Sequence, residues 1–310
     1  MLNEKQSFKE KIVYSEKFVK KLEEYVITQN IRDIQNLLRD KEARLATSID
    51  KERQHWDFNK EKLVKEQCEA VENANSRIVR FLERYIRLNG CNVLDVGCGL
   101  GGVSVALALR GAEVTAMDID KNALKVAKLR AKEHGVKIPF NRCDARNLPF
   151  ASSSFDIVIC RQVLQHIPGD GKIKAIKEIF RVLKREGLLY INTPNRSFPK
   201  DHHDTELWFV HWLPKKIALP YAKMRGRYVP MLHDYISYSK LINTLRKEGE
   251  IQVLTNFLTY EDANDFYNHN KDKINKSFKY LFIFKILKMV SKFITVNKVL
   301  PIRIIIKKKV

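Results

Sequence analysis

A glycine-rich turn is the part of the sequence best suited to bind a ligand. The run from Val93 to Gly102 reads VLDVGCGLGG and lies between an expected strand and an expected helix. Glycines allow a tight turn in which a ligand approaches the backbone, and the N–H groups at a helix start favour an anion. Gly97, Gly99 and Gly102 also fit the dinucleotide pattern G-x-G-x-x-G, so the turn alone leaves NAD open as a ligand.

Three acidic residues narrow the choice of ligand. Asp95 precedes the first glycine by two residues, within reach of an ammonium group lying in the turn. Asp118 ends the next expected strand, 21 residues after Gly97, where a carboxylate accepts hydrogen bonds from both ribose hydroxyls. Asp144 stands where a third strand should end. A carboxylate at that position can accept a hydrogen bond from an adenine amino group, with the Ala145 N–H directed at a ring nitrogen.

The elements that must position these residues alternate between strands and helices. Short apolar runs that end in polar or glycine-containing turns predict strands, and apolar residues at helical spacing between them predict helices. The strands are expected at residues 92–96, 113–117, 155–160, 188–192 and 251–258, and the helices at 103–110, 121–134, 173–183 and 239–247. This order predicts βαβ units and a parallel sheet with helices on both faces.

Residues 1–75 form an expected helical N-terminal cap or dimerisation arm. Apolar residues recur there at three- and four-residue spacing with Lys and Glu between them. A last helix is expected to begin at Asn73 or Asn75 and to end at Gly90.

Taken together, these motifs resemble the class I S-adenosylmethionine-dependent methyltransferases, in the small-molecule branch that includes the ubiquinone-biosynthesis enzymes (methyltransferase domain 11 type). The resemblance rests on the Asp95–Gly101 turn, Asp118, Asp144, the segment 155–167 and the strand 187–195. It covers residues 76–260, and it implies a Rossmann-like, doubly wound α/β fold. The implied sheet has seven strands and is mostly parallel, with one antiparallel strand near an edge and the helical extension before it.

The resemblance also implies S-adenosylmethionine as the cofactor and a role for each matching residue. Gly97, Gly99 and Gly101 would line the methionine portion, with Asp95 near its amino group. Asp118 would bind the ribose, and Asp144 with Ala145 would bind the adenine. Asp120 is a rival to Asp118 in sequence, although a helix N-cap explains it better.

Methyl transfer from a sulfonium requires mainly that the acceptor is aligned and water excluded. If the acceptor is a hydroxyl, a histidine is the usual base near neutral pH. The candidates are His166, which follows the fourth strand, and His202, His203 and His211 in the insertion 194–235. Each is also explained as a surface or packing residue, and their spacing does not require a metal, so we expect none.

The insertion 194–235 leaves the carboxyl end of a strand, which is where open α/β sheets bind ligands. It contains Phe198, Trp208, Phe209, Trp212, Tyr221 and Tyr228. These aromatics fit a lid over a sugar or an amphipathic ring, or a lid that packs on itself. The turn after the fourth strand, Cys160-Arg161-Gln162, has neither the Pro-Pro motif of amino-directed enzymes nor the Pro-Cys nucleophile of cytosine C5 methyltransferases.

The formal net charge of +21 is unevenly distributed, and +11 of it lies in residues 271–310. This basic, apolar tail, within residues 261–310, is too rich in lysine to span a bilayer. Residues 277–310 therefore either lie on an anionic membrane surface or dock on the sheet as a helix and an edge strand around residues 302–306. Five cysteines without a Cys-x-x-Cys pair and a charged N-terminus indicate a cytoplasmic protein, peripheral on the membrane face if the tail binds lipid.

The sequence thus predicts O-methylation of a small-molecule, sugar or lipid-linked glycan acceptor. Two alternatives stay open: an RNA-modifying methyltransferase, suggested by the basic residues of 91–200, and a non-catalytic, cofactor-binding membrane-associated protein. Nucleic acid is the less favoured partner because no RNA-binding module accompanies the domain. The sequence leaves the oligomeric state open.

Overall fold

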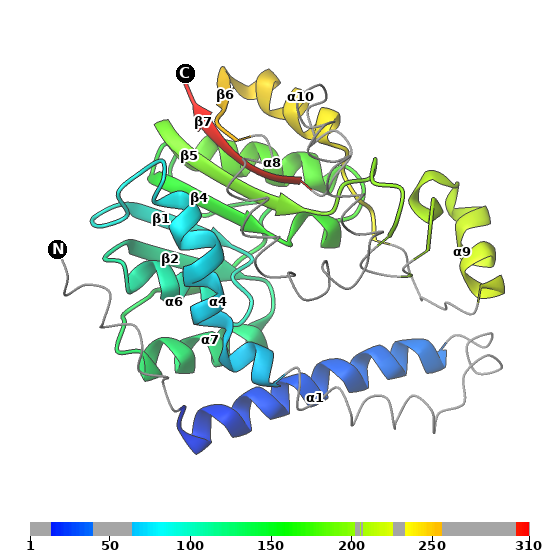
Figure 1. Cartoon of the computed structure of the whole chain (residues 1–310), viewed down its shortest axis with the longest axis horizontal. Helices are drawn as coiled ribbons and strands as arrows, with labels where there is room; N and C mark the ends of the chain where they lie inside the picture. The colour runs from blue at the N-terminus through cyan, green and yellow to red at the C-terminus, as the bar shows by residue number, and fades with distance from the viewer. Residues whose placement is uncertain are drawn as a thin grey trace, which may run out of the picture. The chain divides into compact units, whose positions relative to one another are not determined.

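The computed structural model describes residues 14–39, 64–201, 205, 207–225, 233–255 and 302–309. The chain forms two compact units, residues 1–143 and 144–310. The sheet has seven strands in the order β3 (Phe140–Arg142), β2 (Glu113–Asp118), β1 (Asn92–Val96), β4 (Phe155–Arg161), β5 (Leu183–Thr193), β7 (Ile302–Lys308) and β6 (Ile251–Val253) (Figure 1). This mostly parallel, seven-stranded α/β fold with an N-terminal helical extension confirms the predicted fold class.

In the first unit, β2 pairs in parallel with both β1 and β3. Val93, Leu94 and Val96 of β1 are fully buried, which explains the continuous apolar run, because a strand covered on both faces has no solvent side. Two helices follow the first two strands in the expected βαβ order. They are α6 (Gly102–Ala108) and α7 (Lys121–Glu133).

The N-terminal helix α1 (Glu16–Arg39) buries Phe18, Leu22 and Val26, which lie four residues apart on one face. A second helical stretch consists of α4 (Ala70–Ala74), the π-helical turn η1 (Asn75–Val79) and α5 (Arg80–Leu82). The expected cap at Asn73 or Asn75 is wrong, because both residues lie inside this stretch. The Asn75 side-chain oxygen instead accepts hydrogen bonds from Nε and Nη2 of Arg110, at 3.2 and 2.9 Å.

In the second unit, β4 and β5 are parallel and are connected through α8 (Gly171–Val182). The helix α10 (Tyr238–Glu248) follows Ser237, whose hydroxyl caps it, and it ends at Gly249 as expected. The strand predicted at 251–258 is shorter than expected, since β6 ends at Val253.

The last described segment of the chain is a strand of the sheet. β7 runs antiparallel to β5 on one side and to β6 on the other, and Ile302, Ile304, Ile305 and Ile306 are fully buried. The prediction of one antiparallel strand near an edge is therefore confirmed. Residues 302–308 dock on the sheet, whereas the rest of the predicted basic tail, residues 277–301, lies outside the described residues.

The basic residues of β7 are accommodated locally. Lys308 Nζ donates to the carbonyl oxygens of Phe180 and Leu183, at 2.9 and 2.8 Å, and lies 4.6 Å from the centre of the Phe180 ring. Lys307 pairs with Glu186 at 2.6 Å. Among the helices that the structure describes, none is long and apolar enough to cross a membrane.

Candidate active site

The glycine turn between β1 and α6 needs glycine for backbone reasons. Gly97, Gly99 and Gly101 all have positive φ, at 68°, 53° and 78°. A Cβ on Gly101 would come within 2.9 Å of the Ala127 Cβ in α7, whereas a Cβ on Gly99 would meet nothing within 4 Å. The turn is thus packed tightly on α7 at Gly101 and open at Gly99, where a ligand can approach the backbone.

Gly102, the third glycine of the dinucleotide pattern, has a different explanation. A Cβ there would lie 2.9 Å from the Cβ of Ala70, so this glycine allows α4 to pack closely against α6. Close packing of an N-terminal helix accounts for Gly102 without a dinucleotide.

The structure brings Asp118 and the glycine turn together. Oδ2 of Asp118 accepts a hydrogen bond from the Gly99 N–H at 2.8 Å, and Oδ1 of Asp118 accepts one from the Asp120 N–H at 2.9 Å. Two backbone donors therefore fix the plane of a half-buried carboxylate at the carboxyl end of β2. Each carboxylate oxygen has a second lone pair, which suits it to accept from a vicinal diol.

Asp120 is the N-cap of α7, as expected. Its Oδ1 accepts from the N–H groups of Asn122 and Ala123, at 2.8 and 3.4 Å. Asp120 is therefore a supporting residue for the turn, and Asp118 is the carboxylate that the glycine turn holds.

Asp95 lies at the buried end of the same turn. Only 2% of the residue is exposed, and its Oδ2 accepts a hydrogen bond from the buried Ser104 hydroxyl at 2.6 Å. A buried carboxylate is suited to pair with a cationic group. Ser104 was not singled out from the sequence, although its place one turn into α6 puts it on the face toward β1.

Asp144 and Ala145 begin the second unit. The Arg146 guanidinium donates to both Asp144 oxygens, at 2.5 to 3.0 Å, and this hydrogen bonding lowers the pKa of the carboxyl group. Asp144 is thus held ionised and oriented on the surface, while Ala145 is buried. Arg146, which the sequence pattern did not single out, therefore orients the Asp144 carboxylate.

His166 follows β4 in the short helix η2 (Leu164–His166) and is exposed. Its Nδ1 lies 3.0 Å from Nε2 of His233, and the two rings meet edge to face. Sequence analysis missed His233, because nothing in the sequence links two positions 67 residues apart.

The neighbouring Asp234 anchors this histidine pair. Its Oδ2 accepts from the buried Lys172 Nζ at 2.6 Å and from the Gly169 N–H at 3.2 Å. The segment that carries His233 is thereby tied to the turn that follows η2.

A chain of amide and hydroxyl side chains lies at the carboxyl ends of β4 and β5. Thr193 donates to Gln165, Gln165 donates to Gln162, and Gln162 donates to Asn192, at 3.3, 2.7 and 2.7 Å. Gln162 also has a positive φ of 56°, a strained geometry for a residue with a side chain. The sequence analysis did not identify this chain, because the spacing of its glutamine, asparagine and threonine residues matches no recognisable motif.

His211 has a different environment from His166. It lies in the short helix η3 (Val210–Trp212), with Nε2 3.2 Å from Oδ1 of the fully buried Asp201. Asp201 also accepts from the Tyr235 hydroxyl and from both the N–H and the hydroxyl of Thr205. His211 is therefore part of a structural network, and the candidates His202 and His203 lie outside the described residues.

Two cysteines lie in the glycine turn and in β4. Cys160 is buried in β4, and burial raises the pKa of the Cys98 thiol far above neutrality, so that thiol stays protonated. Over the described ranges, no group of three or more His, Cys, Asp or Glu side chains is arranged to hold a metal ion.

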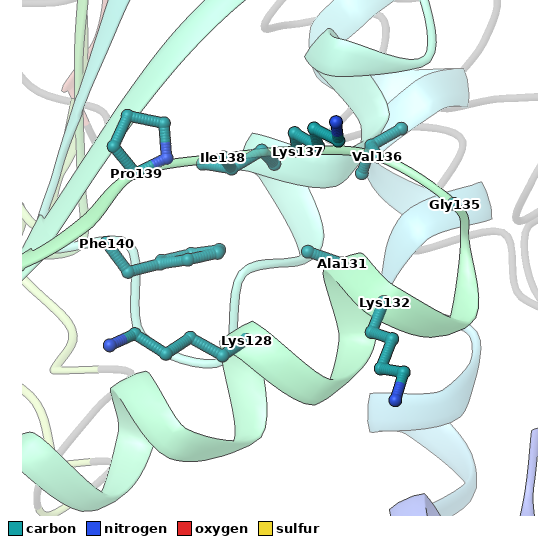
Figure 2. Close-up of a pocket in the computed structure, with 9 residues that line it drawn as sticks. All are labelled: Lys128, Ala131, Lys132, Gly135, Val136, Lys137, Ile138, Pro139 and Phe140. Carbon is teal, nitrogen blue, oxygen red and sulfur yellow. The ribbon is translucent and has the colours of Figure 1, made fainter.

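A cavity of about 740 Å³ lies elsewhere in the first unit. Figure 2 shows it between the last turns of α7 and the segment that leads into β3, with Lys128 and Phe140 side by side. Asp118 is bound to Asp120 at the opposite end of α7, and neither Asp118 nor any residue of the glycine turn lines this cavity.

Comparison with known proteins confirms the resemblance that the motifs indicated. Residues 94–191 match the family model described as a methyltransferase domain. The chain is 38% identical over 120 residues to the ubiquinone biosynthesis O-methyltransferase of Azotobacter vinelandii, covering 38% of this chain and 51% of the relative. The enzyme of the same name from Coxiella burnetii is 37% identical over 120 residues, covering 39% and 50%. The chain thus spans about half the length of the curated relatives it matches.

A crystal structure named "putative sarcosine dimethylglycine methyltransferase" from Galdieria sulphuraria has the same fold. It is 18% identical with a TM-score of 0.50, and the match covers 79% of this chain and 88% of the other. At this identity the similarity concerns the fold alone.

Proposed function

We propose that this chain, which carries a methyltransferase domain over residues 94–191, transfers a methyl group from S-adenosylmethionine to an acceptor. The observation that carries the proposal is the Asp118 carboxylate, fixed by the N–H groups of Gly99 and Asp120 beside an open glycine turn. A carboxylate held this way recognises a ribose diol, and the turn beside it leaves room for the rest of the ligand.

The remaining residues fit the same cofactor. Gly97, Gly99 and Gly101 would face its methionine portion, and Asp95 would neutralise its ammonium group. Asp144 with Ala145 would recognise the adenine, for which the carboxylate of Asp144 must share its hydrogen bonds with Arg146. When bound, the cofactor supplies a methyl group on a positively charged sulfur, an activated leaving group.

The protein's own part is to align the acceptor and to remove its proton. We propose His166 as the base, since it is exposed and has a second imidazole within 3.0 Å, to which a proton can be relayed. His211 fits this role less well because its side chain is buried beside Asp201 and is only 7% exposed. A base that serves a hydroxyl supports O-methylation, and the curated relatives are named as O-methyltransferases.

We further propose that the acceptor is amphipathic, such as a lipid-linked glycan or another lipid-like small molecule, and that the protein works at the cytoplasmic membrane face. Support comes from the lid surface, which we define as residues 207–225, including the helix α9 (Lys215–Met224). Six of the seven large apolar residues that are exposed among the described residues lie on it, with Trp208, Trp212 and Met224 each more than half exposed. The lid surface contains four basic residues and no acidic one.

Aromatic and basic side chains without acids are typical of segments that lie in a bilayer interface. The rings of Trp208 and Phe209, and of Phe209 and Trp212, are 6.0 and 5.0 Å apart, so they form one apolar cluster. We therefore assign the membrane contact to the lid surface. Membrane association of residues 277–301, which lie outside the described residues, stays a prediction from the sequence.

Calorimetry with S-adenosylhomocysteine tests the cofactor, and the absence of binding would refute the proposed activity. Labelled S-adenosylmethionine incubated with fractionated lipids and glycans tests the acceptor, with label expected in an amphipathic fraction. Label in RNA instead would refute the acceptor class.

Flotation with anionic vesicles tests the membrane contact. The double variant Trp208→Ser/Trp212→Ser should lose vesicle binding. The matched control Ile119→Ser, which removes an equally exposed apolar side chain from the other unit, should keep it. Equal flotation of both variants would contradict the assignment of the lid surface.

A further inference from the structure

The helix α1 is attached to the first unit at both ends of α7. At its start, the N–H and the hydroxyl of Ser15 donate to the two carboxylate oxygens of Glu133, at 3.0 and 2.6 Å. The Tyr14 hydroxyl lies 3.0 Å from Nε2 of His134. Glu133 and His134 are at the end of α7, so the two helices run antiparallel, with α1 along the outside of α7 (Figure 1).

Between its two attachments, α1 makes an apolar contact that includes the glycine turn. Phe18, Leu22 and Val26 form a buried cluster with Val126 of α7. Leu100, which lies between Gly99 and Gly101, packs against this cluster. Through Leu100, α1 therefore packs against the turn that would hold the methionine portion of the cofactor.

Further along, α1 reaches the beginning of α7. The Tyr25 hydroxyl and the Gln29 side-chain amide both donate to Oδ2 of Asp120, at 3.3 and 2.9 Å. The other oxygen of Asp120 is used by the helix cap, and its backbone N–H donates to Asp118. Asp120 thus joins α1, α7 and the ribose carboxylate in one hydrogen-bonded chain.

The hydrogen bonds from Tyr25 and Gln29 to Asp120 also have an electrostatic effect. Asp118 and Asp120 are two carboxylates two residues apart, and they repel each other when both are ionised. Two donors from α1 on Oδ2 of Asp120 offset that repulsion, while the cap bonds hold its Oδ1. Because the N–H that donates to Asp118 Oδ1 belongs to the same residue, restraining the Asp120 side chain at both oxygens also restrains the backbone that carries this N–H.

We propose that Tyr25 and Gln29 are positioning residues for the cofactor, which act through Asp120 to orient Asp118 toward the ribose hydroxyls. The inference rests on the proposed function, because it assumes an adenosyl ligand on Asp118. It assigns the N-terminal helix a part in cofactor affinity as well as in stability. By linkage, a bound cofactor then stabilises the docked position of α1 to the same degree.

The test is calorimetry on the full chain with S-adenosylhomocysteine and with its 2′-deoxy analogue. The double variant Tyr25→Phe/Gln29→Leu should bind S-adenosylhomocysteine about tenfold more weakly, the effect expected when a hydrogen-bonded charge is misaligned. It should bind the deoxy analogue with a much smaller loss, because that ligand forms fewer hydrogen bonds to Asp118. The ratio of the two affinities should therefore fall toward one.

Thr28→Ala is the matched control. The Thr28 hydroxyl donates to the Glu24 carbonyl within α1, and the change should leave both affinities and their ratio unaltered. If the double variant does not fold, as judged by circular dichroism, Tyr25→Phe removes a single hydroxyl and should shift the ratio in the same direction by a smaller factor.

The outcomes separate the two proposals. A wild-type protein that does not bind S-adenosylhomocysteine refutes the proposed function. If wild type binds it and the double variant binds equally well, the positioning role is overturned. Equal weakening of both ligands also overturns it, because a merely structural defect would leave the affinity ratio unchanged.

Discussion

The glycine turn of the first unit and the lid surface of the second are built in opposite ways. Around the turn, the carboxylate of Asp118 is held by backbone N–H groups, so its geometry follows from the path of the main chain. In the second unit, carboxylates such as the buried Asp201 and the half-buried Asp234 bind side chains from distant segments, and large apolar side chains of the lid surface remain exposed.

This difference matches the two kinds of ligand. A ligand shared by many enzymes can be recognised by main-chain geometry, which changes little when side chains vary. An acceptor that differs between enzymes calls for side chains on segments that tolerate change. The four predictions below test this division of labour between main chain and side chains.

The largest effect is expected in the second unit, at the proposed base. His166→Gln should lower the rate constant of methyl transfer by about 100-fold or more, because a positioned base contributes on the order of 10²–10⁴. The rate would be measured with labelled S-adenosylmethionine and a responsive lipid fraction. His211→Gln is the control, and a larger loss there than at His166 would reverse the assignment.

The next effect concerns the first unit. Asp118→Ala should weaken S-adenosylhomocysteine binding on the order of 100-fold, since it removes a charged acceptor for two hydroxyls. Calorimetry measures it, and Glu113→Ala, at the exposed opposite end of β2, should bind normally. If Asp118→Ala binds S-adenosylhomocysteine as tightly as wild type, Asp118 does not bind the ribose, and the main-chain geometry that holds its carboxylate does not recognise this ligand.

A smaller effect is expected on stability. Gly101→Ala should lower the free energy of unfolding by about 1–3 kcal/mol more than Gly135→Ala, because its Cβ would meet Ala127 as well as requiring positive φ. Gly135 has φ of 67° and open space around it, so it isolates the backbone cost. Urea unfolding compares the two, and equal losses would contradict tight packing of the turn on α7.

The smallest effect is a pH dependence of the α1 attachment. Burial first, and then the neighbouring Arg130, lowers the pKa of His134 below its usual 6.5. His134 therefore takes up a proton more readily in the unfolded chain than in the folded one. The stability that neutral His134 contributes to the folded state is complete above about pH 6.5, and it is lost as the pH falls through the folded pKa. His134→Gln should flatten the decline of the unfolding temperature between about pH 7.5 and 5.5, whereas an unchanged slope would exclude His134 as its source.

Much of the first unit was determined by the sequence itself. The strands β1 and β2, the helix α7 and its cap at Asp120 follow from apolar periodicity, turn chemistry and an N-cap residue, all of which act within a few residues. The positions of the glycines and of Asp118 relative to them follow for the same reason. The backbone geometry of the glycine turn and its hydrogen bond to Asp118 were therefore predictable from the sequence alone, and its role as a ligand site stays a prediction.

Tertiary structure decided the rest. Three features join segments that are far apart in the chain: the pairing of His166 with His233, the hydrogen bond from Tyr235 to Asp201, and the insertion of residues 302–308 between β5 and β6. A basic, isoleucine-rich segment is compatible with a membrane surface and with a strand, and only the presence of β5 and β6 as hydrogen-bonding partners favours the strand. Local patterns fix what a segment can become, and long-range packing selects among those states.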